Sequence, residues 1–530
     1  MNRHSEPSAL SGGQSQLSHR QIQIVFIGLM AGMLLGALDQ TVVSTALPTI
    51  VGELGGLEHL SWVITAYLLT ATTSMPLYGK LSDIYGRKVL YQFGIVIFLI
   101  GSLLSGLSQN MLELILFRGM QGLGAGGIMT MAQAIIGDLV SPRERGRYQG
   151  YLGTVFAVSA VAGPLLGGFF TDQVTWRWVF YINIPIGIAA FAMIRRFVTD
   201  PPYIRRGSAG IDYWGLSLLV VGIGALQIAL DRGQEQDWFA SHWITGLFVV
   251  AAAALVVLVR HQFAVRHPIV DLRVFRERTY ATGVFLMMLM GFVLYGSLVI
   301  FPILLQTLMG YSPLESGIAM APRGLGMLAA TPIVGFLIAR IDARKLLATG
   351  FGIGVVTLFW FSRLAMTAGY WDYFWPQFIQ GVGFSLLFVP LTTVTMDRIP
   401  NAGMGNATSI FNLMRNIGGS MGIALTQTLL ARHRQVHINN LGTHVSLYSA
   451  QTQQALQQLH GAFMAQGADS VTATRRAYAA LWGTVQRHAA MLAFNDAFLV
   501  LAAVFLVLMP LTLAMRRPQS GPASGGAAPE

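Results

Sequence analysis

Four charged side chains lie within long apolar segments of this 530-residue chain. Asp39, Arg118, Arg323 and Arg415 each interrupt a stretch of about 20 residues that is otherwise uncharged. A charge at the centre of a bilayer costs several kcal/mol, so such residues are rarely incidental. A carboxylate in that environment can bind a proton or pair with a guanidinium. Asp39 and Arg118 therefore predict proton binding that alternates with an ion pair, and a permanent structural ion pair is the alternative.

The segments that carry these charges decide whether they can meet. Asp39 lies about 15 residues, or ~22 Å, into the first apolar segment. Arg118 lies a few residues into the fourth segment, which would run the opposite way, so the two can reach a similar depth. Arg323 and Arg415 have no acidic residue in the neighbouring apolar segments. Arg415 has Asn412 and Asn416 beside it, so it could line a cavity, contact carbonyls or face an anionic substrate group.

The composition indicates that lipid surrounds most of the chain. Only 11% of the residues are charged, against ~25% in soluble domains, and 54% are hydrophobic. There is no cysteine, which excludes thiol chemistry, and none of the three lysines lies in a phosphate-binding loop. We expect no catalytic residues, no metal and no cofactor, so the chain is not predicted to be an enzyme. Fourteen segments are long and apolar enough to span a membrane, at 24–47, 61–79, 89–110, 114–137, 148–171, 178–194, 213–230, 240–259, 280–304, 317–339, 346–366, 374–396, 403–430 and 493–515.

The basic residues give the orientation. With the N-terminus in the cytoplasm, 23 of the 34 Lys and Arg residues fall on inside segments, and the short outside loops hold only Arg177, Arg232 and Arg363. An even number of spans then places both termini in the cytoplasm. The net charge of +11 thus marks cytoplasmic loops and does not indicate a nucleic-acid partner.

Two sequence pairs indicate a duplicated half. The turn sequence Gly79–Lys88 has a degraded counterpart from Gly335 to Lys345, and Arg87 and Arg344 are 257 residues apart. Gln121-Gly-Leu-Gly recurs as Gln380-Gly-Val-Gly at an offset of 259 residues. Two parallel six-helix halves with a two-helix insert account for fourteen spans. The predicted units are a tail at 1–23, a bundle at 24–198, an insert at 199–279, a second bundle at 280–515 and a tail at 516–530.

The one sizeable polar segment is a loop at 432–490, which is expected on the outside. Its helical spacing predicts two short amphipathic helices, which either pack on themselves as a cap or dock a partner. His433 and His437 have the i, i+4 spacing of metal ligands. No acidic third partner accompanies them in the sequence, so no metal site is expected there.

Glycines and charges at the segment ends could latch helices in one of two packings. Glycines let helices approach closely. The GxGxxG match at 122–127 and the GxSxG match at 418–422 are also explained by helix packing, because both lie inside apolar helices rather than after a strand. Solvated loop charge is the alternative for the charged members. The candidate latch residues are Gly79, Asp83, Gly86, Arg87, Lys88, Asp138, Gly163, Pro164, Gly167 and Gly168.

Taken together, these motifs resemble the major facilitator superfamily. Gly79–Lys88 resembles its signature loop, Arg118 with Gln121-Gly122 its fourth-span motif, and Gly163–Gly168 the antiporter motif of its fifth span. Leu38–Val43 with Ala46-Leu47-Pro48 is similar to the first span of the fourteen-span drug:proton antiporters of the EmrB/QacA type. Three further motifs are closest to the EmrB-like branch: Ala225–Phe239, Pro268–Leu272 and Trp375–Gly381.

The resemblance implies an all-α multi-pass protein of a bacterial inner membrane that exports amphipathic compounds, including antibiotics, by alternating access. The proton gradient would drive export, with Asp39 and Arg118 as the coupling pair. Members of this branch in two-membrane bacteria work with a periplasmic adaptor and an outer-membrane channel. A dedicated exporter of one metabolite, such as a siderophore, fatty acid or antibiotic, is the alternative, and a membrane receptor or structural protein is a third reading. The candidate cavity residues are Gln121, Phe292, Tyr295, Arg323, Phe384, Phe411, Asn412 and Arg415.

Overall fold

Helices make up all the regular structure in the described part of this computed structural model. It describes residues 19–55, 60–139, 145–198, 212–265, 268–338, 340–400, 403–446 and 448–515. The helices of the first half are α1 (His19–Leu54), α2 (Leu60–Tyr85), α3 (Arg87–Leu107), α4 (Met111–Leu139), α5 (Arg145–Gln173), α6 (Trp178–Tyr181) and α7 (Asn183–Phe197). The insert holds α8 (Tyr213–Gly233), η2 (Trp238–Ala240), α9 (His242–Ala264) and η3 (Leu272–Arg276). The second half holds α10 (Arg278–Ile303), η4 (Leu304–Leu308), α11 (Pro313–Leu337), α12 (Ala343–Phe361), α13 (Tyr370–Met396), α14 (Met404–His444), α15 (Ala450–Ala465), α16 (Ser470–Leu508) and η6 (Met509–Ala514).

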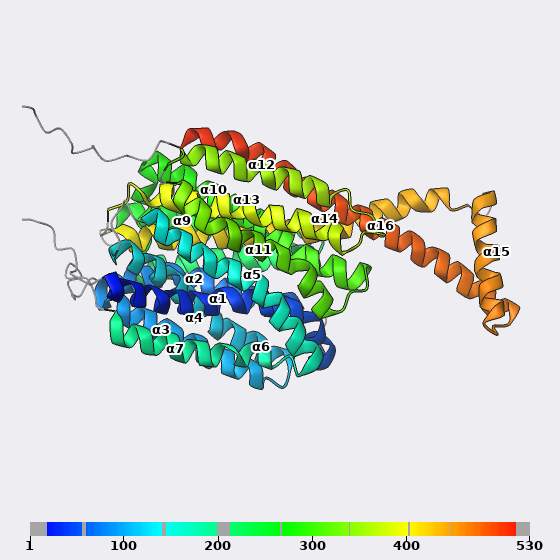
Figure 1. Ribbon diagram of the computed structural model, residues 1–530, viewed down its shortest axis with the longest axis horizontal. Helices are drawn as coiled ribbons and strands as arrows, with labels where there is room; N and C mark the ends of the chain where they lie inside the picture. Colours follow the sequence, from blue (N-terminus) through cyan, green and yellow to red (C-terminus); the bar gives the residue numbers. More distant parts are fainter. Residues whose placement is uncertain are drawn as a thin grey trace, which may run out of the picture.

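The long helices run side by side as a membrane-spanning bundle (Figure 1). Among the described residues, eleven segments are long and apolar enough to cross a bilayer. The other long helices, α2, α4 and α14, carry more polar residues and pack within the same bundle. The described chain begins and ends at one end of the bundle, here named the termini end. The opposite end, which carries a projecting hairpin, is named the hairpin end.

The two halves are built alike. In the first half α4 packs against α2 and α3, and in the second half α13 packs against α11 and α12. The repeated glycines make this possible, because a Cβ on Gly122 would collide with the Tyr67 carbonyl of α2 and a Cβ on Gly381 with the Arg323 carbonyl of α11. Equivalent glycines thus serve equivalent helix contacts, and the GxGxxG match is a packing motif.

The insert lies at the junction of the halves, where α8 contacts both α2 and α14. Asp212 caps α8 by accepting a hydrogen bond from the Gly215 amide at 2.8 Å, and it meets His261 of α9 at the same distance. Burial works to raise the pKa of Asp212, but the hydrogen bonds from His261 and Gly215 outweigh it, so the pKa lies below its usual value. A charged cap therefore ties together the two insert helices.

The structure changes the expectation for residues 432–490. Instead of two separate short helices, α14 continues to His444, α15 is the one short helix, and α16 runs unbroken from Ser470 into the last apolar segment. The hairpin projects away from the bundle (Figure 1), and α15 packs against α16, so the segment packs on itself as expected but does not cover the bundle. The first helix is longer than the first expected span. The tail was expected to end at residue 23, but α1 already begins at His19. The tail at 516–530 lies outside the described residues.

Candidate functional site

Asp39 is the centre of a buried polar cluster between α1 and α4. Its side chain is fully buried, and Oδ2 lies 2.5 Å from Nη1 of Arg118, which is also buried. Gln121, one turn further along α4, donates from Nε2 to Asp39 Oδ1 at 2.8 Å and accepts from Arg118 Nη1 at 2.7 Å. The i, i+3 spacing places both α4 side chains on the face that meets α1. The structure thus brings together the residues expected to form the coupling pair.

Further groups complete the cluster on its other sides. Asn183 at the start of α7 donates to Asp39 Oδ1 at 3.2 Å and to Ser102 Oγ at 3.0 Å. The Arg118 guanidinium lies 4.3 Å from the centre of the Tyr67 ring, a cation–π contact, and its Nε donates to the Val63 carbonyl. Asn183 and Ser102 were not predicted, because isolated Asn and Ser residues in apolar segments are common and give no signal in one sequence. Asn183 thus adds a second amide donor to Asp39 Oδ1, and Ser102 holds the Asn183 side chain in place.

The second half has no acid at the equivalent place. Ser297, which is 258 residues after Asp39, accepts a hydrogen bond from Arg323 Nη1 at 3.4 Å. Gln377, which is 259 residues after Arg118, accepts from Arg323 Nε at 2.7 Å. In the described part of the chain Arg323 pairs with no carboxylate, and its Nη2 is buried without a partner. Among the described residues, the carboxylate of the Asp39 cluster therefore has no counterpart in the second half.

The predicted cavity residues are buried but do not line the cavities found at the hairpin end. Gln121 belongs to the Asp39 cluster, and Tyr295 donates to Gln40 of α1 at 3.1 Å. Asn412 donates to Gln133 of α4 at 2.8 Å, and Arg415 lies over the Phe156 ring at 5.5 Å. The others pack in the core of the second half: Phe292, Phe384 and Phe411. Their part in substrate binding stays a prediction.

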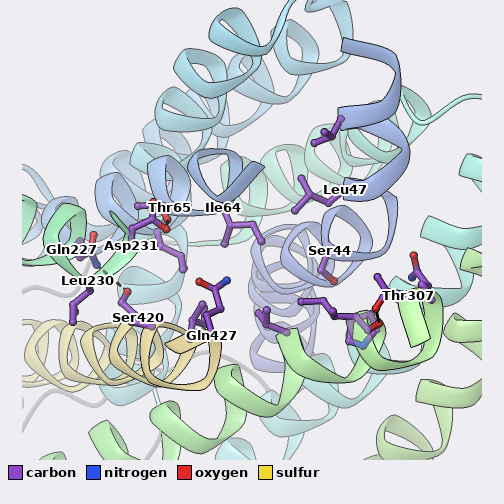
Figure 2. Close-up of a pocket in the computed structure, with 18 residues that line it drawn as sticks. Ser44, Leu47, Ile64, Thr65, Gln227, Leu230, Asp231, Thr307, Ser420 and Gln427 are labelled. Atoms are coloured by element: carbon purple, nitrogen blue, oxygen red, sulfur yellow. Dashed lines mark hydrogen bonds between the residues drawn. The ribbon is translucent and has the colours of Figure 1, made fainter. Parts of the chain in front are cut away.

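A cavity of about 390 Å³ lies where the two halves and the insert meet, toward the hairpin end (Figure 2). Figure 2 shows side chains from α1, α2, α8 and α14 directed around it. Apolar residues alternate with uncharged polar groups, and Asp231 of α8 is the only charged lining residue. The lining residues are Ser44, Leu47, Val51, Ile64, Thr65, Leu68, Gln227, Leu230, Asp231, Val299, Pro302, Ile303, Gln306, Thr307, Ser420, Ile423, Ala424 and Gln427.

At the termini end the halves are in close contact. A Cβ on Gly79 of α2 would lie 3.3 Å from Cβ of Ser409 on α14 and 3.2 Å from the Gly405 carbonyl. On the first half, Arg87 Nε lies 2.5 Å from Asp138 Oδ2, and both side chains are 1% exposed. Gly86 has φ +101°, which glycine adopts without strain in the turn before α3. Lys88 is half-buried, and the side chain of Asp83 lies outside the described residues.

The glycines of α5 bring three helices together. A Cβ on Gly163 would collide with Thr41 of α1, and one on Gly167 would lie 2.7 Å from the Val42 carbonyl. Gly168 faces the other half, because its Cβ would lie 2.6 Å from Cα of Leu314 on α11. In return, the Pro164 carbonyl lies 2.5 Å from the Cβ position of Gly317 on α11. Residues 163–168 thus pack one half closely against the other.

Two similar helical halves, a cavity between them and a buried ion pair in one half define a membrane transporter. The family model described as "Major Facilitator Superfamily" matches residues 29–423, and the chain belongs to this family. The human organic anion transporter MFSD10 (TETRAN) has the same fold, with a TM-score of 0.62 at 12% identity over 92% of this chain and 99% of that one.

Three curated relatives match over most of their length. "Multidrug export protein EmrB" of Escherichia coli K12 is 32% identical and covers 97% of this chain and 99% of its own. "Fatty acid resistance protein FarB" of Neisseria gonorrhoeae is 32% identical over 93% of this chain and 96% of its own. "Multidrug transporter protein MdtP" of Bacillus subtilis is 33% identical over 83% of this chain and 81% of its own.

Proposed function

We propose that this protein exports amphipathic drugs and other toxic compounds across a bacterial inner membrane in exchange for protons. The observation that carries the proposal is the buried Asp39–Arg118 pair in a chain with a cavity between its halves. Asp39 and the cavity residue Ser44 lie on one helix about 7.5 Å apart along its axis. Proton binding at Asp39 would release Arg118 and change the packing of α1 against α4.

The names of the relatives support drugs as the exported compounds, since EmrB and MdtP are called multidrug proteins. The cavity has the chemistry of a broad binding site, because apolar walls with scattered hydrogen-bonding groups accept many shapes. The insert helix α8 contributes Gln227 and Asp231 to it (Figure 2), so the insert completes the site as well as joining the halves.

The proposal includes fourteen crossings with both termini in the cytoplasm. The eleven apolar segments, together with α2, α4 and α14, give an even number of crossings. The termini end would then be cytoplasmic, and the hairpin of α14, α15 and α16 would project into the periplasm. A projecting hairpin of this kind offers a docking surface for a periplasmic adaptor that leads to an outer-membrane channel.

Everted membrane vesicles test the function directly. Vesicles that contain the protein should accumulate a fluorescent amphipathic dye when a proton gradient is imposed, and a protonophore should reduce the accumulation to that of vesicles without the protein. The driving force is ~2.3 kcal/mol per charge for each 100 mV. Accumulation that a protonophore leaves unchanged would contradict proton exchange, and no accumulation across a broad panel of compounds would contradict drug export.

A disulfide between the halves tests alternating access. In the variant Gly79→Cys/Ser409→Cys the two Cβ positions are 3.3 Å apart, close to the separation that a disulfide requires. Because the chain has no other cysteine, oxidation can form only this bond within one molecule. We expect dye transport to fall in proportion to the cross-linked fraction and to return after reduction. Each single-cysteine variant is the control, and full transport by cross-linked protein would refute opening at the termini end.

A dedicated exporter of one amphipathic acid is the second candidate function. A cavity of about 760 Å³ beside the first contains Arg434 and Arg487, which suit a carboxylate, and FarB is named for fatty acid resistance. A deletion strain would discriminate the two candidates. Sensitivity to fatty acids alone favours the dedicated exporter, whereas sensitivity to several unrelated compounds favours the multidrug pump.

A further inference from the structure

Two histidines and a carboxylate converge at the base of the projecting hairpin. His433 and His437 are one turn apart on α14, and Asp496 lies on α16 where that helix enters the bundle. Asp496 Oδ2 lies 2.7 Å from Nδ1 of His433 and 2.8 Å from Nε2 of His437. The expectation that the histidines lack an acidic partner is therefore wrong. The acid comes from another helix, 59 residues further along the chain than His437.

We propose that these three side chains bind a borderline divalent transition-metal ion, with Zn²⁺ as the best fit. Their three donor atoms lie within 4.8 Å of one another. A zinc ion held ~2.0–2.2 Å from each imidazole nitrogen and carboxylate oxygen requires ligand atoms about 3 to 3.5 Å apart in a tetrahedral site. Small side-chain rotations would bring the three donor atoms to those separations. Imidazole ligands favour zinc, nickel, cobalt or copper over magnesium and calcium, which prefer oxygen.

The surroundings of the three side chains suit an ion that is open to water. His433, His437 and Asp496 are 39%, 22% and 35% exposed, so an aqueous ion can reach them and a water molecule can complete the coordination. Arg432 and Arg434 flank His433 in the sequence. The side chains of consecutive residues point about 100° apart around the helix axis, so these arginines do not share the helix face that carries the histidines.

Metal binding at this place would fasten α14 to α16 where the hairpin leaves the bundle. The same α14 carries Ser420 and Gln427 on the cavity wall. An ion that fixes the base of the hairpin would therefore act on a helix that also lines the cavity of the proposed export function. The site would make the stiffness of the hairpin depend on the metal in the surrounding solution, a property that goes beyond export itself.

The test uses the full-length protein in detergent, without a polyhistidine tag and treated with EDTA. Titration calorimetry with Zn²⁺ should show one site per chain with a micromolar or tighter Kd, and Zn²⁺ should raise the Tm. His433→Gln, His437→Gln and Asp496→Asn should each weaken binding at least tenfold and remove the Tm rise. His444→Gln, on the same helix but outside the cluster, is the matched control and should bind as the wild type does.

A second measurement does not depend on variants. Co²⁺ bound to the wild type should give visible d–d absorption of a four- or five-coordinate site with nitrogen ligands, and an excess of Zn²⁺ or EDTA should remove that absorption. No binding at 100 µM Zn²⁺, an octahedral spectrum of weakly held Co²⁺, or equal binding by all three variants would overturn the proposal. The three side chains would then form only a hydrogen-bonded contact between α14 and α16.

Discussion

Replacing Asp39 by Asn is expected to abolish proton-driven accumulation of dye. The amide has nearly the shape of the carboxylate but cannot exchange a proton, so the pair with Arg118 can no longer alternate between a charged and a protonated state. We expect accumulation in everted vesicles to fall at least tenfold, to the level of protonophore-treated wild type. Exchange of dye down its own gradient should persist, because that process moves no proton.

Two variants make this result specific. Glu235→Gln changes an exposed acid at the hairpin end, whose partner is Arg232, and should transport like the wild type. Asp39→Glu keeps an exchangeable carboxyl group and should recover part of the accumulation, with an altered pH profile. If Asp39→Asn still accumulates dye in a protonophore-sensitive way, the coupling carboxylate lies elsewhere.

The second large effect is on stability. Arg118→Gln removes the countercharge of a carboxylate that has no contact with water, and breaking a buried ion pair in this way costs ~3–5 kcal/mol. We expect a clear decrease in the Tm of the purified protein. The double variant Asp39→Asn/Arg118→Gln carries no charge in the cluster, so it should recover most of that stability while remaining unable to couple transport to protons.

Arg177→Gln is the matched control for the stability measurement. Arg177 pairs with Glu53 at 2.6 Å, but the two side chains are 28% and 49% exposed, so losing this pair should cost less than ~1 kcal/mol. A Tm for Arg118→Gln equal to that of Arg177→Gln would contradict the energetic role of the buried pair. A double variant less stable than Arg118→Gln would show that the carboxylate is satisfied without the arginine.

The sequence by itself determined the membrane character, the transporter family and the charges on which the proposed mechanism depends. The membrane character follows from composition, since an apolar segment of 20 residues is recognisable in any tertiary context, and the family follows from the resemblance of several motifs that occur in order along the chain. The meeting of Asp39 with Arg118 was also within reach, because antiparallel helices of known length place residues at calculable depths. The glycines of α4 and α14 were correctly assigned to packing, because both sets lie inside apolar helical segments.

Only the tertiary structure decided which side chains from distant helices share a site. Asn183 joins the Asp39 cluster and Asp496 joins the two histidines because helix rotation and tilt are set by packing along the whole bundle. No local pattern carries that information. For the same reason the cavity at the hairpin end is lined in part by α8 residues such as Gln227 and Asp231, to which no pattern in the sequence pointed. A sequence shows which charges must be accommodated, and the packing of the helices determines their partners.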